Sequence, residues 1–311
     1  MTTSAKPPKS GSSGSKQSSQ QRLAAQRAEA ARARIAAEKR RRMLFMVGIP
    51  IAVVLVAIGV LVAVKLASGS SAKSGVKSAA ASDAVIHDVT NVPVSVLNAV
   101  GVGTAKSAPK AVTAPALTLD GKPRVAYFGA EYCPYCAAER WPTVVALSRF
   151  GTFQNLGETA SSPSDVYPST ATLSFHGASF TSPTVSFTGD EMQSNQVVNG
   201  SYATLDTPSA ADQQLIATYD APPYFTNKGA IPFIDIGGKY LSSGASYDPG
   251  VLKGKTQAEI AAALSDPNSP IAKAVDGTAN LITAAICKTT ANAPAAVCTS
   301  AGVQAAMAVL K

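Results

Sequence analysis

The fold of this chain is decided by residues 125–141, which read VAYFGAEYCPYCAAERW. The apolar run 125–128 predicts a buried strand, and Cys133 and Cys136 follow it at the start of a stretch typical of a helix. Cysteines three apart at a helix N-terminus are close enough to form a disulfide, and the partial positive charge of the helix end favours a thiolate. The spacing indicates redox chemistry, although it also fits half of a zinc site or a structural disulfide.

The charge of the chain is concentrated in its N-terminal tail. The 311 residues include 27 Lys and Arg against 19 Asp and Glu, a formal net charge of +8. Residues 1–43 hold eleven of the basic residues and two of the acidic ones, so the rest of the chain is nearly neutral. The basic balance therefore belongs to one segment and does not support nucleic-acid binding by the main domain.

Residues 43–64 form an uncharged and mostly apolar run, which predicts one transmembrane helix. At about 1.5 Å per residue this run makes a helix of roughly 33 Å, enough to cross a hydrocarbon core of about 30 Å. A cleavable signal usually has an apolar region of only about 7–15 residues. We therefore expect an uncleaved anchor at 43–66 that contacts the lipid bilayer through 43–64.

The charges beside this segment predict its orientation. The run 39–42, Lys-Arg-Arg-Arg, directly precedes it, whereas Lys65 alone is basic at its other end. Positive charge favours the cytoplasmic side, so we expect a single-pass cell-membrane protein with a cytoplasmic N-terminus and an extracytoplasmic domain, where disulfides persist. The segment 21–42 either sets this topology beside anionic lipid or binds nucleic acid or a cytoplasmic partner, and the first interpretation is the simpler one.

Composition divides the chain into five segments. Stretches rich in Ser, Gly and Lys have little to bury, and stretches rich in Ala, Arg, Glu and Gln favour helix. The segments are a disordered basic cytoplasmic tail at 1–20, a basic cytoplasmic helix at 21–42, the transmembrane anchor at 43–66, a flexible linker at 67–82, and one extracytoplasmic domain at 83–311.

Hydrophobic patterns in the domain predict alternating strands and helices. The stretch 124–128 predicts a strand, and 134–150 predicts a helix that Pro142 should kink because proline lacks a backbone donor. Further along, the patterns predict strands at 172–175 and 184–187, which pair as a hairpin in one interpretation, a helix at 210–219, a strand pair around Gly237-Gly238, and helices from Thr256 onward. The fold class is therefore α/β, with extra helices at the C-terminal end.

Two segments resemble the thioredoxin-like superfamily. Residues 128–136 are similar to its active-site segment, in which a strand leads into Cys-x-x-Cys and the first cysteine caps a proline-kinked helix. Ile231-Pro232 resembles its second hallmark, a strand opened by a cis-proline that faces the cysteines. More closely, 129–141 with 146–153 is similar to a family catalogued as domain of unknown function 929, which contains membrane-anchored thioredoxin-like proteins.

The resemblance implies a thioredoxin-like fold with an inserted region. About 95 residues separate Cys136 from Pro232, so an inserted β-hairpin region is implied between them, containing the strands predicted at 172–187. The chain departs from cytosolic thioredoxins at Tyr127, which stands where they carry an acid six residues before the first cysteine. The resemblance therefore does not extend to their route of proton transfer.

The resemblance also assigns roles to the residues of the site. Cys133 would exchange disulfides as a thiolate, and Cys136 would resolve the mixed disulfide. Pro232 would keep a backbone edge open beside the sulfurs for an extended substrate, unless it is an ordinary strand-entry proline. The substrate-binding residues would be Tyr132, Tyr135 and Ile231.

An inert disulfide and a metal site are the alternatives for the cysteine pair. A zinc site needs two more ligands, and His87 and His176, the only histidines, have no ligand-like spacing. We therefore expect neither metal nor cofactor. Among nearby charges, Glu131 and Glu139 disfavour a thiolate and Arg140 favours it, and the sequence does not rank them.

Cys287 and Cys298 form a second pair near the C-terminus. In an extracytoplasmic domain they predict a structural disulfide between two helices, worth about 3 kcal/mol for a loop of about twelve residues. The alternative is a second redox pair that relays electrons to Cys133 and Cys136, which nothing local to these residues favours.

These features predict a membrane-anchored, extracytoplasmic thiol-disulfide oxidoreductase. Its partners would be the thiols or disulfides of exported proteins and a further redox protein. The alternative is a non-catalytic binding or scaffold module that retains the thioredoxin-like structure at the membrane. Intact Cys133 and Cys136 favour the enzyme.

Overall fold

The computed structural model describes residues 73–310. The predicted tail at 1–20, helix at 21–42 and anchor at 43–66 lie outside the described residues. In the part of the chain that is described, no helix is both long enough and apolar enough to cross a membrane.

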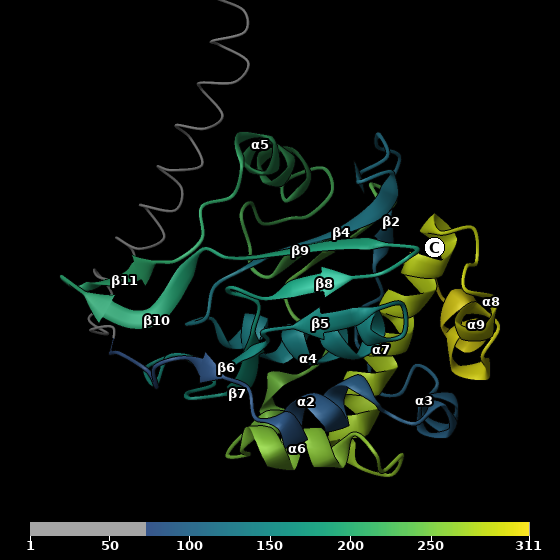
Figure 1. Ribbon diagram of the computed structural model, residues 1–311. Helices are drawn as coiled ribbons and strands as arrows, with labels where there is room; N and C mark the ends of the chain where they lie inside the picture. Colours follow the sequence, from purple (N-terminus) through teal and green to yellow (C-terminus); the bar gives the residue numbers. More distant parts are fainter. Residues whose placement is uncertain (1–72, 311) are drawn as a thin grey trace, which may run out of the picture. The chain divides into compact units, whose positions relative to one another are not determined.

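A six-stranded mixed sheet forms the centre of the domain (Figure 1). Its strand β4 (Lys122–Gly129) pairs in parallel with β9 (Ser186–Glu191) on one side and antiparallel with β12 (Phe233–Ile236) on the other. A Gly-Gly turn, in which both residues have a positive φ that suits glycine, joins β12 to its antiparallel neighbour β13 (Tyr240–Ser243). The short strands β2 (Lys110–Ala111) and β3 (Thr118–Leu119) pair with β13 and β4.

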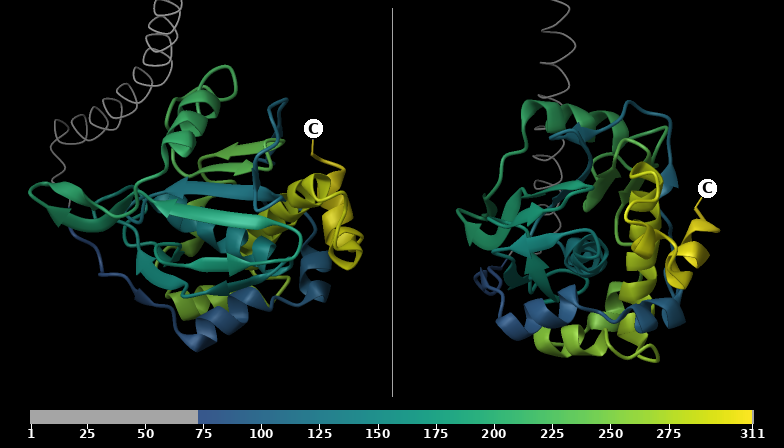
Figure 2. Two further views of the ribbon diagram at one scale, coloured as in Figure 1. Left: turned by 45° about the horizontal axis from the view of Figure 1, so that its top comes forward. Right: turned by 45° about the vertical axis from the view of Figure 1, so that its right-hand side comes forward.

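Helices cover both faces of this sheet. Neighbouring residues of β4 point to opposite faces, so Tyr127 joins a larger core and Phe128 a smaller one. The larger core packs against α4 (Pro134–Ser148) and α7 (Pro270–Thr289), and the smaller core packs against α5 (Ala210–Tyr219) (Figure 1 and Figure 2). The sheet is therefore the middle of three layers.

The predicted helices and strands of this core are present. The strand expected at 124–128 lies within β4, and the helices expected at 134–150 and 210–219 are α4 and α5. Pro142 lies inside α4, which continues to Ser148. The fold is a mixed α/β structure, as the sequence predicts.

Apart from β9, the strands between α4 and α5 form three small sheets, one of which also includes β1. Each consists of short antiparallel strands outside the central sheet. They are β1 (Ala79–Ala80) with β6 (Gly157–Ala160) and β7 (Ala171–Ser174), β5 (Thr152–Gln154) with β8 (Ser179–Thr181), and β10 (Gln193–Val198) with β11 (Ser201–Thr204).

The hairpin considered for 172–175 and 184–187 is wrong in its pairing, since these two described segments lie in different sheets. The first lies in β7, which pairs with β6, and the second enters β9, which pairs in parallel with β4. β8 intervenes and pairs with β5. The inserted region does contain a hairpin, β10 with β11, whose turn residues Asn199 and Gly200 both have a positive φ.

Helices predominate after Thr256, as predicted, and the Cys287–Cys298 disulfide joins two of them. Cys287 lies in α7 and Cys298 ends α8, with 5.7 Å between their Cα atoms. The remaining helical elements are α2 (Asp83–Thr90), α3 (Val94–Val100), the 3-10 helix η1 (Pro249–Leu252), α6 (Gln257–Ala263), α8 (Ala295–Cys298) and α9 (Ala301–Met307).

Part of the segment expected as a linker, 67–82, lies against the domain. The Gly75 N–H donates to the Asn195 carbonyl at 2.8 Å, and β1 pairs with β6. The described residues of this segment therefore extend one of the small sheets.

Candidate active site

The Cys-x-x-Cys segment lies at the junction of β4 and α4. Cys133 is the N-cap of α4, and its sulfur accepts a hydrogen bond from the Cys136 backbone N–H at 3.5 Å. Pro134 occupies the first turn, where a missing backbone donor is tolerated. The helix N-terminus therefore directs N–H groups at the Cys133 sulfur, which favours its ionised form.

The two thiols differ in exposure. Cys133 retains 6 % of its accessible surface, whereas Cys136 retains none. Both cysteines carry free thiols. Both cysteines are therefore buried, and Cys133 is the less buried of the two.

The loop before β12 lies against Cys133. The Ile231–Pro232 peptide bond is cis, as predicted, and the Cys133 thiol donates to the Ile231 carbonyl oxygen at 3.7 Å. Pairing of Phe233 with Phe128 at the end of β4 holds this loop beside the cysteines. The sheet thus brings together two segments that lie 98 residues apart in the sequence.

Tyrosines surround the exposed side of the site. Tyr132 stacks on Tyr202 of β11 with ring centroids 4.2 Å apart, and the 41 % exposed Tyr135 meets Tyr167 edge-on at 5.9 Å. The Tyr202 hydroxyl donates to Ser162 Oγ at 2.6 Å. Sequence reasoning missed Tyr167 and Tyr202, and the one available signal was that both belong to the insertion that follows the cysteines.

A buried ion pair lies close to the cysteines. Arg140, one helical turn after Cys136, donates through Nε to Glu191 Oε1 at 2.7 Å and through Nη2 to the Ala130 carbonyl at 2.8 Å. Both charged side chains are fully buried. Mutual pairing offsets the cost of burying each charge, and nothing near Glu191 in the sequence indicated this role.

The surroundings shift the pKa values of the two thiols in opposite directions. Burial raises the pKa of Cys133, but hydrogen bonds from the Cys136 thiol and from the Cys136 and Tyr135 N–H groups, together with the Arg140 charge, bring it below the usual value. Burial and the hydrogen bond to Cys133 raise the pKa of Cys136 well above the usual value. Of the two thiols, Cys133 is therefore the one that ionises more readily.

The two glutamates near the cysteines accept hydrogen bonds from serines. Glu131 Oε1 accepts from the Ser78 and Ser174 hydroxyls at 2.7 and 2.8 Å. Glu139 accepts from the Ser246 N–H and hydroxyl, each at 2.8 Å, while burial raises its pKa to about 7. Of the three charges that the sequence leaves unranked, the arginine of the ion pair is the one that acts on both thiols.

The histidines contact carboxylates. His87 lies 3.0 Å from Asp88 and His176 lies 2.8 Å from Asp206, each distance measured from Nδ1 to a carboxylate oxygen. Within residues 73–310, no three His, Cys, Asp or Glu side chains are placed to hold a metal ion.

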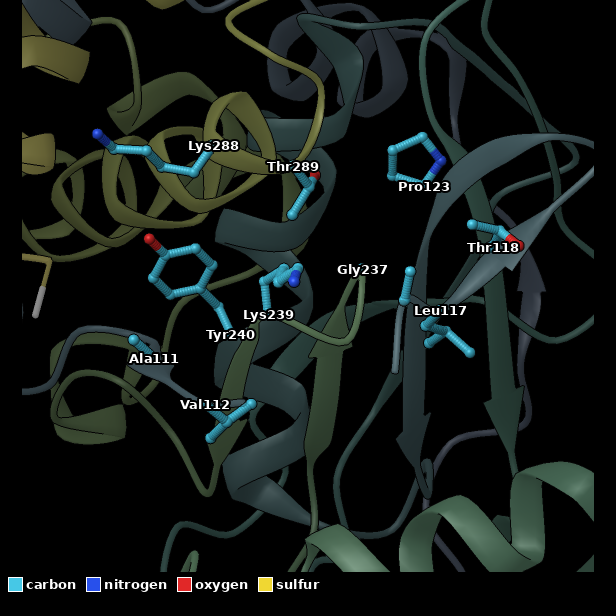
Figure 3. A pocket seen from close by; sticks show the side chains of 11 residues that line it. Ala111, Val112, Leu117, Thr118, Pro123, Gly237, Lys239, Tyr240, Lys288 and Thr289 are labelled. Carbon is cyan, nitrogen blue, oxygen red and sulfur yellow. The ribbon is translucent and has the colours of Figure 1, made fainter. Parts of the chain in front are cut away.

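The cavity in Figure 3 lies at the other end of the sheet. It has a volume of about 380 Å³, and its lining includes Pro123 at the start of β4, Gly237 just after β12 and Thr289 at the end of α7. β4 runs from this cavity toward the cysteines, and β12 runs from the cysteine end back to it. The cavity is therefore separate from the cysteine site.

The fold and site together define a mixed α/β protein in which a Cys-x-x-Cys helix faces a cis-proline loop. A family model described as "Domain of unknown function (DUF929)" matches residues 110–288, more than half of the chain. The protein belongs to this family, as its sequence predicts. Neither the curated proteins nor the solved structures give a match.

Proposed function

We propose that the protein is a membrane-anchored, extracytoplasmic thiol-disulfide oxidoreductase that uses Cys133 and Cys136 to act on exported proteins. The observation that carries this proposal is the contact between the Cys133 thiol and the carbonyl of Ile231, next to cis Pro232. A nucleophilic sulfur at a helix N-terminus, beside a backbone edge, is suited to exchange with an extended substrate.

A thioredoxin-like fold is part of this proposal. The strand order β9, β4, β12, β13 has one parallel pair and two antiparallel pairs. Both α4 and α7 pack on one face of it. This order and the position of the cysteines between β4 and α4 resemble the thioredoxin fold, with 152–185 and 192–204 as insertions on either side of β9.

The exchange proceeds in two steps. The Cys133 thiolate attacks one sulfur of a substrate disulfide, so that a mixed disulfide forms and the first substrate thiolate leaves. Cys136 then attacks the Cys133 sulfur and releases the second substrate thiol. Two electrons pass to the substrate, the protons lost by the cysteines balance those gained by the substrate thiols, and the reverse sequence oxidises a substrate dithiol.

Trapping of substrates tests the enzyme function. A Cys136→Ser variant of the full chain should accumulate mixed disulfides with exported proteins, because the resolving thiol is missing. The matched control is the double variant Cys133→Ser/Cys136→Ser, which should trap nothing. Absence of adducts in the single variant, seen on non-reducing gels with mass spectrometry, would contradict the proposal.

The reduction potential of the Cys133/Cys136 pair separates an enzyme from a binding module. Catalytic pairs lie between about −270 and −120 mV, and inert structural disulfides lie below about −300 mV. Equilibration with glutathione gives the value and also indicates whether the pair serves as reductant or oxidant. A potential below that range would favour a non-catalytic scaffold.

The proposed location rests on the apolar run 43–64 and the basic residues before it. A membrane-impermeant thiol reagent should label Cys133 on intact cells after mild reduction. Labelling that appears only after lysis would contradict an extracytoplasmic site.

A further inference from the structure

The Arg140 guanidinium has one buried nitrogen that lacks an acceptor. Its Nε and Nη2 donate to Glu191 and to the Ala130 carbonyl. Its Nη1 is buried and has no hydrogen-bond partner among the described residues. Burying a cationic N–H without an acceptor is unfavourable, so this position favours a negative charge nearby.

The geometry places this guanidinium next to both cysteines. Arg140 follows Cys136 by four residues in α4, a spacing that puts two side chains on the same side of a helix. The Ala130 carbonyl accepts from Arg140 Nη2 at 2.8 Å and from the Cys133 backbone N–H at 3.2 Å. The guanidinium and the first residue of the active-site segment therefore donate hydrogen bonds to the same carbonyl oxygen.

Charged and titratable groups reach the cysteines from three elements and from the loop before α4, where Tyr132 lies. Burial is the largest cause that raises the pKa of Cys136. Cys133 on α4 and Glu191 on β9 also raise this pKa, whereas Arg140 on α4 lowers it. From β4, Tyr127 contributes a buried hydroxyl that has no hydrogen-bond partner within the described structure. Burial raises the pKa of Tyr127 well above its usual value, so this phenol stays neutral.

We propose that Arg140 stabilises the thiolate of Cys136 while it resolves the mixed disulfide, with Nη1 as the donor that faces the developing charge. Arg140 is thus a positioning and electrostatic residue, and this role rests on the oxidoreductase function proposed above. Once Cys133 is bonded to a substrate sulfur, it carries no negative charge, and Cys136 has to ionise in a buried position. The guanidinium offsets that cost.

The resolving step balances as follows. Cys136 loses its proton to solvent, and its sulfur forms a bond to the Cys133 sulfur while the bond between Cys133 and the substrate sulfur breaks. The departing substrate thiolate takes up a proton. The two cysteines are oxidised and the substrate disulfide is reduced, with no further reactant.

Opposite charge changes in the ion pair test this role. In the full chain in detergent, Glu191→Gln leaves the guanidinium uncompensated and should speed resolution at neutral pH roughly tenfold. The double variant Arg140→Met/Glu191→Gln removes both charges and should slow it roughly tenfold relative to Glu191→Gln. Tyr127→Phe keeps shape and charge and should change the rate less than about twofold.

An aromatic disulfide reagent releases one coloured thiolate when it forms a mixed disulfide at Cys133 and a second one on resolution, so the second phase of the absorbance change gives the rate of resolution. The pKa of Cys136 is read in parallel from thiolate absorbance in a Cys133→Ser background, where Glu191→Gln should lower it. Damage that lets water reach Cys136 would speed resolution in both variants, so the result that supports the role of Arg140 is an acceleration in Glu191→Gln that is lost in Arg140→Met/Glu191→Gln. Equal resolution rates in Glu191→Gln and the unmodified chain, or slower resolution in Glu191→Gln, would overturn the inference.

Failure of the two proposals is distinguishable. If the unmodified chain forms no mixed disulfide at Cys133, the oxidoreductase function itself is wrong. If it forms and resolves one, but the charge changes at Glu191 and Arg140 leave the rate unaltered, only the role of Arg140 is wrong.

Discussion

Helices α4 and α7 pack on the same face of the sheet, and each is associated with a cysteine pair and a buried ionisable side chain. At α4, Cys133 retains a small exposed area at the helix N-terminus and Arg140 is paired with Glu191. In α7, Cys287 is buried and bonded to Cys298. The buried carboxylate oxygens of Asp276 have no hydrogen-bond partner in the described part of the chain.

This difference shows how burial acts on a charge with and without a partner. Arg140 keeps its charge, because the attraction of Glu191 outweighs the desolvation that lowers its pKa. Burial raises the pKa of Asp276 to about 8, so at neutral pH it is mostly uncharged. The α4 end therefore offers a fixed charge next to a reachable thiol, whereas α7 offers a neutral, cross-linked support.

Selective reduction is the strongest test of this contrast. In the fully oxidised native protein, the Cys133–Cys136 disulfide should be reduced by dithiothreitol at least roughly 100-fold faster than Cys287–Cys298, because the latter sulfurs are fully buried. Timed alkylation and peptide mass spectrometry give the two rates. In guanidinium chloride the two disulfides should be reduced at similar rates. Similar rates in the native protein would contradict the difference between the two cysteine pairs.

The second test concerns Asp276. Its pKa is higher in the folded state than in the unfolded chain, so stability is greatest below about pH 4 for this group and declines as pH rises toward 8. Asp276→Asn should therefore stabilise the protein by roughly 4 kcal/mol at pH 7 and by little at pH 4. Urea unfolding at both pH values measures this.

Glu139 serves as the control for that pH dependence. Burial raises its pKa to about 7, and the neighbouring Tyr247 is influenced by both Glu139 and Asp276. Asp276→Asn should leave a residual decline of stability between about pH 4.5 and pH 7, which becomes smaller when Glu139→Gln is added. An unchanged pH profile in Asp276→Asn would mean that Asp276 is charged in the folded protein.

Local sequence patterns were sufficient to predict the helices, strands and cysteine positions around α4. The apolar run before Cys133, the helix after it and the Ile231-Pro232 strand entry are short-range signals, and each has the predicted structure. The disulfide between Cys287 and Cys298 followed from cysteine number and the expected compartment. These features depend on few residues at fixed spacing, which is why a single sequence contains them.

The partners of these residues depended on tertiary pairing and were not predictable. Glu191 reaches Arg140 because β9 pairs in parallel with β4, and a strand pattern does not reveal its neighbour across about 60 residues. Tyr202 reaches Tyr132 through a hairpin whose polar strands gave no clear alternation. Asp276 has an ordinary polar side chain in an Ala-rich helix, so its burial was not evident from its neighbours.

The third test removes the cross-link of α7. Cys287→Ala/Cys298→Ala should lower the free energy of unfolding by about 3 kcal/mol, because the disulfide closes a short loop in the unfolded chain. Cys133→Ala/Cys136→Ala should lower the free energy of unfolding by clearly less, when the reference is the unmodified chain with Cys133 and Cys136 reduced.

Substrate trapping through Cys133 should survive the loss of the second pair. If trapping disappears in a variant that is still folded, Cys287 and Cys298 would be a redox relay.

The smallest effect is expected at the tyrosine stack beside the site. Tyr202→Ala removes a ring that stacks on Tyr132 at 4.2 Å and should cost about 1 kcal/mol, whereas Tyr202→Phe keeps the stack and loses only the hydrogen bond to Ser162. Hydrogen exchange should then increase in β10, β11 and the loop at 130–132, with no change in α7, because the stack joins the inserted hairpin to the cysteine end of the sheet. Increased exchange in α7 of Tyr202→Ala would show that the two regions are coupled, and the contrast between the thiol site at the α4 end and a separate, cross-linked support at α7 would no longer hold.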